Sequence, residues 1–197
     1  MTGRPPAPAG HRAAWRAGWL RQARRVASPN FGPRPDGMTI DLVVVHSISL
    51  PPGIYEGDAI ERLFTNRLDP AADPYFETLA GVRVSAHFLV RRDGTLLQFV
   101  SCDERAWHAG VSSWRGRADC NDFSIGIELE GLEGGLFEAA QYECLGATLD
   151  SIAARYPVAA VTGHEHIAPG RKSDPGAGFD WVRLAYRMRA FSLEILP

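Results

Sequence analysis

Four consecutive aliphatic residues, Leu42, Val43, Val44 and Val45, constrain the fold of this chain more than any other segment. A run this short and this apolar is typical of a strand buried on both faces, in the middle of a sheet that other elements cover. The next residue is His46. We therefore expect His46 at the carboxyl end of a central strand, which is where α/β sheets present ligand-binding and catalytic groups.

Predicted strands and helices alternate along the rest of the chain. Short apolar or period-two runs predict strands at residues 40–45, 84–90, 95–100, 123–129 and 158–161. Asp93-Gly94 predicts a hairpin between the second and third of these. Apolar spacings of three and four predict helices after Asp58, over 142–156 before Pro157, and from Asp180 to Phe191. The interleaving indicates an α/β fold, a single domain whose central mixed β-sheet is flanked by helices.

The length and the two ends of the chain indicate its organisation. A chain of 197 residues with 45% hydrophobic content suits one domain. We expect a flexible tail at 1–17 and a folded domain at 18–197, with Trp15, Trp19 and Leu20 at a spacing that predicts a short first helix. Residues 1–18 lack the apolar stretch of a secretory signal, and no run approaches the roughly 20 apolar residues that cross a bilayer. These features predict a cytoplasmic monomer with no membrane partner.

Charge and cysteine content exclude some classes of protein. A formal net charge of −2 gives no general attraction to polyanions, so we expect no nucleic-acid partner. The three cysteines form no C-x-x-C pair and are odd in number. This pattern argues against a disulfide framework or a structural zinc cage, and it predicts reduced, mostly buried thiols.

A second histidine completes a candidate metal site. His164 follows the predicted strand at 158–161 and begins a loop rich in Gly and Pro, and Asp174 lies ten positions further on (174 − 164). Two neutral imidazoles and one carboxylate leave a fourth tetrahedral position for water, which is the pattern of catalytic zinc. A lone histidine after a strand is more often structural. Together, His46, His164 and Asp174 predict one Zn²⁺ per chain.

Other polar residues compete for roles in this site. His87, His108 and His166 are alternative ligands that position alone does not exclude. His87 lies in a strand pattern, where it is either a polar neighbour of the site or a core histidine with its hydrogen bonds satisfied. Glu128 and Glu130 share one strand face. They are either a solvated pair, or one of them is a general base beside a zinc-bound water.

Several segments resemble one enzyme family in order and with few length changes. They are residues 43–46, 83–87, 91–94, 106–113, 120–131 and 171–176. In these segments the chain resembles the zinc-dependent N-acetylmuramoyl-L-alanine amidases (amidase type 2), and within them most closely the cytoplasmic members. The resemblance runs from about Gly18 to Trp181. It implies the fold shared by these amidases, phage amidase lysozymes and peptidoglycan recognition proteins.

The resemblance also implies an activity and a site. Such enzymes cleave the amide between the lactyl group of muramic acid and L-alanine, and the cytoplasmic members act on 1,6-anhydro-muropeptides returned from wall turnover. The matching positions imply zinc ligands at His46, His164 and Asp174. They imply a catalytic acid or base at Glu128 and an oxyanion partner at Lys172.

Substrate contacts follow less directly from the resemblance. The sequence predicts that Arg83 and Arg171 bind stem-peptide carboxylates, and that Trp107 with His108 forms a wall for sugar or peptide. His87 and Ser47 are the remaining predicted contacts. Ser47 stands where many cytoplasmic members carry an Asn that touches the sugar, and Asp119 stands where relatives have a basic residue. Both departures predict looser recognition of the anhydro sugar.

Two alternatives remain at this point. One is an exported wall amidase of the same fold, and the other is a non-catalytic receptor for peptidoglycan fragments, which relatives become when they lose a zinc ligand. The presence of all five metal and catalytic residues favours an enzyme. A preference for soluble anhydro-muropeptide over intact sacculus would separate the first alternative from a recycling enzyme.

Overall fold

A mixed β-sheet forms the centre of the molecule in the computed structural model, which describes residues 14–188 and 194–195. Within that part of the chain the strand order is β13-β12-β5-β11-β6-β7-β3. The strands are β3 (Arg24–Arg25), β5 (Leu42–Ile48), β6 (Phe88–Val90), β7 (Leu96–Gln98), β11 (Ser124–Glu130), β12 (Ala160–Gly163) and β13 (Glu194–Ile195). Neighbouring strands are parallel except β6 and β7, which are antiparallel. The predicted mixed sheet is therefore confirmed.

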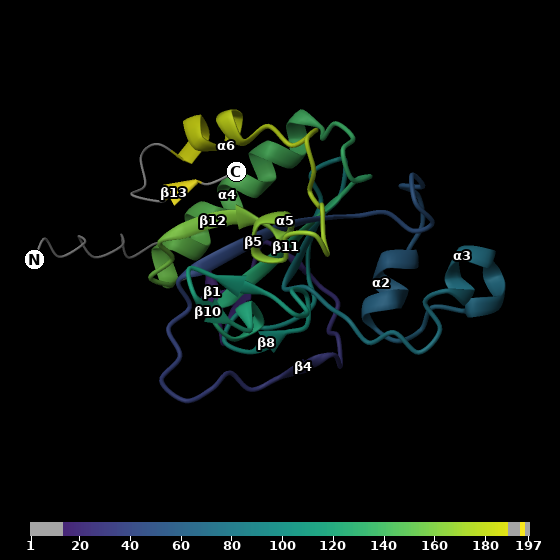
Figure 1. Ribbon diagram of the computed structural model, residues 1–197, viewed down its shortest axis with the longest axis horizontal. Helices are drawn as coiled ribbons and strands as arrows, with labels where there is room; N and C mark the ends of the chain where they lie inside the picture. Colours follow the sequence, from purple (N-terminus) through teal and green to yellow (C-terminus); the bar gives the residue numbers. More distant parts are fainter. Residues whose placement is uncertain (1–13, 189–193, 196–197) are drawn as a thin grey trace, which may run out of the picture.

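Helices and short hairpins surround this sheet. The helical elements are α2 (Ala59–Phe64), η1 (Pro70–Ala72), α3 (Pro74–Glu77), η2 (Cys120–Asp122), α4 (Ala139–Arg155), α5 (His164–Ile167) and α6 (Trp181–Met188). The remaining strands pair in twos: β1 (Trp15–Arg16) with β2 (Trp19–Leu20), β4 (Phe31–Gly32) with β8 (Arg105–Ala106), and β9 (Ser113–Trp114) with β10 (Arg117–Ala118). Helices α4 and α6 lie on one side of the sheet, and α2 and α3 form an arm that projects beyond its edge (Figure 1).

The central strand β5 is buried on both faces, as predicted. Val43 and Val45 pack in the same core cluster as Leu145 of α4, whereas Leu42 and Val44 belong to a cluster on the opposite face. The strand is longer than predicted because its pairing with β11 continues through Ile48. His46 consequently lies within the paired part of the strand, two residues before its end, where β11 holds its backbone rigidly.

The hairpin predicted at Asp93-Gly94 joins β6 and β7 and is confirmed. Gly94 has a φ of +85°, a left-handed conformation that glycine adopts without steric cost. The Asp93 carboxylate accepts a hydrogen bond from the Thr95 amide at 2.8 Å. Strand β6 begins only at Phe88 because the preceding backbone turns to other partners: the Ser85 amide donates to the Trp107 carbonyl.

The predicted short helix at Trp15 to Leu20 is wrong, because these residues form the β1–β2 hairpin. Ala17 and Gly18 have φ of 47° and 73°, the left-handed pair that a tight two-residue hairpin turn requires. Trp15 is buried edge-on against Phe88 and Tyr156. The folded body therefore includes residues 14–17, which the sequence placed in a tail. The rest of that tail lies outside the described residues.

Helix ends agree with the sequence in two cases out of three. The Asp180 carboxylate accepts a hydrogen bond from the Arg183 amide at 2.8 Å and so caps α6, although Phe191 lies outside the described residues. Helix α4 ends at Arg155, before Pro157. Asp58 occupies the predicted cap position of α2, but its carboxylate binds the Arg62 guanidinium instead.

Two general expectations can be compared with the described part of the chain. Cys102, Cys120 and Cys144 are free thiols, the first two buried, which agrees with the prediction. None of the helices described is both long enough and apolar enough to span a membrane.

Candidate metal centre and active site

Three adjacent parallel strands bring the predicted site residues to one edge of the sheet. His46 of β5 pairs in register with Glu128 of β11. On the other side of β5, Gly163 at the end of β12 pairs with Val45, so His164 follows directly beside His46. The carboxyl ends of parallel strands meet at the same edge, and this places two imidazoles and a carboxylate side by side.

The loop after α5 returns Asp174 to this edge. It turns tightly because the amides of Arg171 and Lys172 both donate to the Ala168 carbonyl. The Glu165 amide then donates to the Asp174 carbonyl at 2.9 Å, which pins the end of the loop beside the start of α5. The loop between His164 and Asp174 thus folds back and places the two side chains next to each other, as the sequence predicted.

His46, His164 and Asp174 form a compact and buried cluster. The two Nδ1 atoms lie 2.9 Å apart, and Asp174 Oδ2 lies 3.2 Å from that of His46 and 3.1 Å from that of His164. Ligands about 2.0–2.1 Å from a tetrahedral zinc are separated by roughly 3.3 Å. In the described part of the chain these three residues are the group whose ligand atoms lie close enough to hold a metal ion.

Hydrogen-bond partners define which ring nitrogen faces the cluster. The Ser124 hydroxyl donates to the Cys120 carbonyl, so it accepts from Nε2–H of His108 at 3.3 Å. Nδ1 of His108 then carries a lone pair and accepts from Nε2–H of His46 at 3.0 Å. On the other side, Nε2–H of His164 donates to the Ala109 carbonyl at 3.0 Å.

Both Nδ1 lone pairs therefore point at each other and at Asp174. Three electron-rich atoms about 3 Å apart repel one another unless a cation lies between them. Two imidazoles and one carboxylate are also a donor set that zinc prefers. The residues present thus fit a divalent metal ion of this kind.

The pKa values of the two carboxyl groups of the site, Glu128 and Asp174, are shifted in opposite directions. Burial raises the pKa of Glu128 well above its usual range, and the nearby Asp174 charge raises it further, while Lys172 opposes both. Burial alone would also raise the pKa of Asp174, but His164 and His46 hold it below its usual range. A pair of carboxyl groups whose environments separate their pKa values is suited to two different chemical roles.

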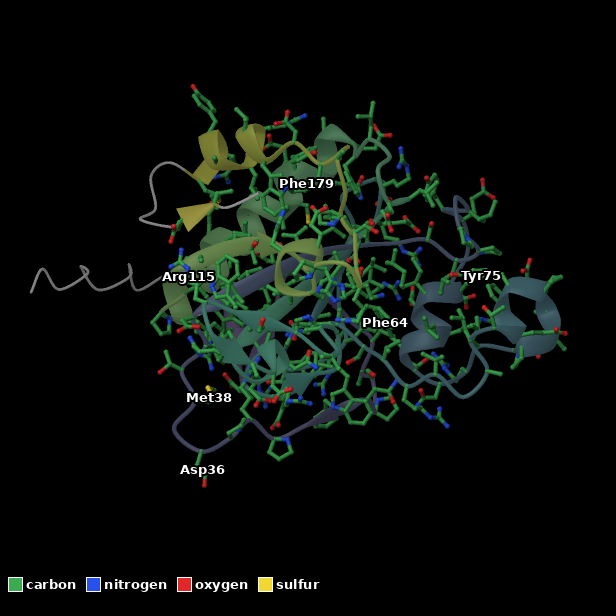
Figure 2. The ribbon with its side chains drawn as sticks, in the orientation of Figure 1. Asp36, Met38, Phe64, Tyr75, Arg115 and Phe179 are labelled. Atoms are coloured by element: carbon green, nitrogen blue, oxygen red, sulfur yellow. The ribbon has the colours of Figure 1, made fainter. Side chains whose placement is uncertain are left out.

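These residues line one end of a cleft with a volume of about 470 Å³. Glu128 is 8% exposed, and its Oε2 has no hydrogen-bond partner among the described residues. Lys172, exposed, borders the same end. The other end is formed by apolar side chains of the α2–α3 arm and its neighbours, among them Phe64 and Tyr75, which Figure 2 labels.

The predicted substrate contacts divide into two groups. Ser47, Trp107 and Arg171 line the cleft. The Arg171 guanidinium, however, donates to the Ala109 and Val111 carbonyls at 2.6 Å each, so it is engaged in holding a loop. Arg83 is exposed and does not line the cleft. Its expected contact with a stem carboxylate has no support in this geometry.

His87 is a core residue and not a cleft residue. It is fully buried, its Nδ1 accepts from the Gly126 amide at 3.0 Å, and its Nε2–H donates to the Glu104 carbonyl at 3.1 Å. No ring atom is left for a substrate, which corrects the predicted contact. The core alternative accounts for the residue because each buried nitrogen has a partner.

Of the other candidates, His108 hydrogen-bonds to His46 and borders the cleft, whereas His166 and Glu130 lie apart from the cluster. The His166 ring accepts from the Gly163 amide at 3.2 Å and packs against Trp181. Glu130 shares a strand face with Glu128 as predicted, but it binds the Arg91 guanidinium outside the cleft. Asp119 is exposed and is also absent from the cleft lining.

Sequence reasoning missed Arg34, which supports the site from behind. Its guanidinium donates to the backbone carbonyls of Asn121, Asp122, Cys102 and Ser124 at 2.8–3.2 Å. These bonds hold the segment that leads into β11. A single arginine in a loop of Gly and Pro shows no sequence pattern that predicts such a role.

The burial of His87 leads us to predict how the stability of the protein falls in acid. Burial, with Arg34 nearby, lowers its pKa from 6.5 to about 3. Below pH 6.5 the unfolded chain binds a proton that the native state refuses, so the free energy of unfolding falls by about 1.4 kcal/mol per pH unit until about pH 3. His87→Asn keeps an acceptor for the Gly126 amide but does not titrate. Between pH 7 and pH 5, the free energy of unfolding of the metal-free variant should therefore fall by about 2 kcal/mol less than that of the metal-free unaltered protein. Urea denaturation at the two pH values measures both losses, and equal losses would contradict the prediction.

Comparisons with known proteins agree with the geometry. Residues 36–177 match the family model described as N-acetylmuramoyl-L-alanine amidase. The 1,6-anhydro-N-acetylmuramyl-L-alanine amidase AmpD of Citrobacter freundii is 56% identical over 168 residues, which cover 84% of this chain and 90% of that protein. A crystal structure of an AmpD selenomethionine derivative superposes with a TM-score of 0.84 at 53% identity, covering 87% of this chain and 97% of the other.

A further solved structure contains a ligand. The amidase AmiD of E. coli, in complex with anhydro-N-acetylmuramic acid-L-Ala-D-gamma-Glu-L-Lys, matches with a TM-score of 0.57 at 31% identity, covering 83% of this chain and 62% of the other. The family match covers well over half of the chain, and the AmpD relative is matched over most of its length. The chain belongs to the N-acetylmuramoyl-L-alanine amidase family.

Proposed function

We propose that this amidase hydrolyses the amide between the lactyl group of 1,6-anhydro-N-acetylmuramic acid and L-alanine of the stem peptide, in peptidoglycan recycling. The observation that carries the proposal is the buried His46–His164–Asp174 cluster beside Glu128 in a cleft. The high identity to AmpD, whose name states this substrate, supports the anhydro sugar. The ligand in the AmiD complex has the same linkage.

The proposed mechanism uses one zinc ion held by the two Nδ1 atoms and Asp174. When bound, zinc lowers the pKa of a water ligand and polarises the scissile carbonyl, which an unactivated amide needs. Glu128 takes the proton from the attacking water and later delivers it to the departing alanine nitrogen. Its burial beside the cluster suits this exchange, because the group must hold the proton between the two steps.

Lys172 has the complementary role in this proposal. Its ammonium group is a compact positive charge on an exposed side chain that lines the same cleft and acts electrostatically on Glu128. There it stabilises the negative oxygen that develops when water adds to the carbonyl, a contribution of roughly 3 kcal/mol in comparable sites. Ser47 and Trp107 line the same cleft and are the proposed contacts for sugar or peptide.

Three substrates test the proposal with the zinc-loaded enzyme. They are a soluble anhydro-muropeptide, the same muropeptide with a reducing sugar in place of the anhydro ring, and intact sacculi. We expect mass spectrometry to show free sugar and free peptide from both soluble muropeptides, because recognition of the anhydro sugar is predicted to be loose, and much slower release from the sacculi. Comparable release from sacculi would favour an exported wall amidase. Binding without cleavage, measured by calorimetry, would favour a receptor.

The remaining expectations stay predictions from the sequence. They are the cytoplasmic location, the monomeric state, and the absence of nucleic-acid and membrane partners. The anhydro specificity is also predicted to be loose, because Ser47 stands where relatives carry Asn and makes fewer hydrogen bonds. Its Oγ is itself buried and has no hydrogen-bond partner among the described residues.

A further inference from the structure

A chain of hydrogen bonds runs outward from the candidate metal ligand His46. Nε2–H of His46 donates to Nδ1 of His108 at 3.0 Å, and Nε2–H of His108 donates to the Ser124 hydroxyl at 3.3 Å. The Ser124 hydroxyl donates in turn to the Cys120 carbonyl. Because a backbone carbonyl only accepts, the direction of every bond in the chain is set from its outer end.

The His108 ring occupies a site that the surrounding structure shapes for it. Its backbone amide and that of Ala109 both donate to the Asn121 side-chain oxygen, at 3.1 and 2.8 Å. Gly126 of β11 provides the space, since a Cβ there would lie 2.4 Å from Cγ of the His108 ring. His108 is 8% exposed, and its ring crosses that of His46 at 82° with centroids 5.0 Å apart.

His108 itself is poorly placed to bind the metal. Its Nδ1 faces Nε2 of His46, on the side of that ring away from His164 and Asp174. A mere space-filling role would not require the two polar contacts that both of its nitrogens make. The geometry therefore separates His108 from the ligand set and connects it to one member of that set.

We propose that His108 is a positioning residue for the zinc site, and this rests on the metal site in the proposed function. By accepting from Nε2–H of His46 it keeps Nδ1 of that ring unprotonated and aimed at the cation. The adjacent Ala109 carbonyl does the same for His164, and it is held in place by the Arg171 guanidinium. One short segment, residues 108–111, thus orients both imidazole ligands.

Two variants of matched shape test this role. Asn and Leu both branch at Cγ, but only His108→Asn places an acceptor oxygen near the position of Nδ1. We expect His108→Leu to weaken Zn²⁺ affinity by about 10- to 100-fold, measured by competition with a chromophoric chelator on the metal-free protein. His108→Asn should retain most of the affinity, and its visible spectrum with Co²⁺ should stay close to that of the unaltered protein.

The outcomes separate this role from the proposed function. Equal weakening by Leu and Asn, or no weakening by either, would overturn the positioning role, even if the unaltered protein binds zinc and cleaves its substrate. An unaltered protein that binds no zinc would overturn the proposed function itself. Should His108→Leu not fold, as judged by thermal unfolding, Ser124→Ala removes the acceptor that sets the direction of the chain. It should weaken Zn²⁺ affinity in the same direction, and unchanged affinity would count against the proposal.

Discussion

Replacing Glu128 by Gln is expected to lower kcat for muropeptide hydrolysis by about 10²- to 10⁴-fold while zinc content stays unchanged. Gln keeps the size and shape of the side chain but cannot exchange a proton with water or with the leaving nitrogen. Glu128 lies beside the metal cluster and is not one of its three members, so metal binding should survive. Steady-state kinetics on the anhydro-muropeptide, together with metal analysis of the same samples, checks both halves of this expectation.

The chain contains a matched control for this substitution. Glu130 lies two residues further along the same strand face but pairs with Arg91 outside the cleft. Glu130→Gln should therefore lower thermal stability and leave kcat close to that of the unaltered enzyme. A Glu128→Gln enzyme with nearly full kcat would show that another group moves the proton. A loss of zinc in that variant would instead make Glu128 part of the metal site.

Asp174→Ala is expected to abolish tight zinc binding, and activity with it. Changes in residues that only support metal ligands cost about 10- to 100-fold in affinity, so removal of a direct and negatively charged ligand should cost more than about 100-fold. Asp174 is the anionic member of the cluster, and two neutral imidazoles alone would have to hold the cation. Metal analysis after dialysis, with and without added zinc, measures the loss.

A carboxylate elsewhere provides the comparison for Asp174. Asp119 is exposed and does not border the cleft, and its left-handed backbone conformation is one that Asn tolerates. Asp119→Asn should keep one zinc per chain. If Asp174→Ala also keeps full zinc and activity, the assignment of the metal ligands is refuted, whatever the family relationship indicates.

Local sequence patterns predicted those elements of the fold whose structure is determined by residues close together in the sequence. The short apolar run at Leu42 to Val45 predicted a strand covered on both faces because it is brief and rich in β-branched residues, and β5 is such a strand. The alternation in β11 placed Glu128 opposite Ile127. Patterns failed at Trp15 to Leu20, where a helical spacing coincides with a hairpin that pairs Trp15 with Leu20.

The candidate site was predictable in its members but not in its supports. His46, His164, Asp174, Glu128 and Lys172 were found because each residue type carries its chemistry in the sequence and matches a family motif. The roles of His87, Arg171 and Arg34 were not predictable, since polar side chains of the same type serve either a substrate or a buried backbone group. Which of these they serve depends on what the fold places within 3 Å of them.

The sequence by itself therefore determined the class of fold and the family, and it named the candidate residues for binding a metal and transferring a proton. Only the tertiary structure decided which nitrogen of each imidazole faces the cluster, because that depends on hydrogen bonds to His108 and to the Ala109 carbonyl, both distant in the chain from the rings they orient. It also decided that Glu128 and Asp174 differ in acidity. Burial and neighbouring charge set a pKa, and neither is a property of a residue in isolation.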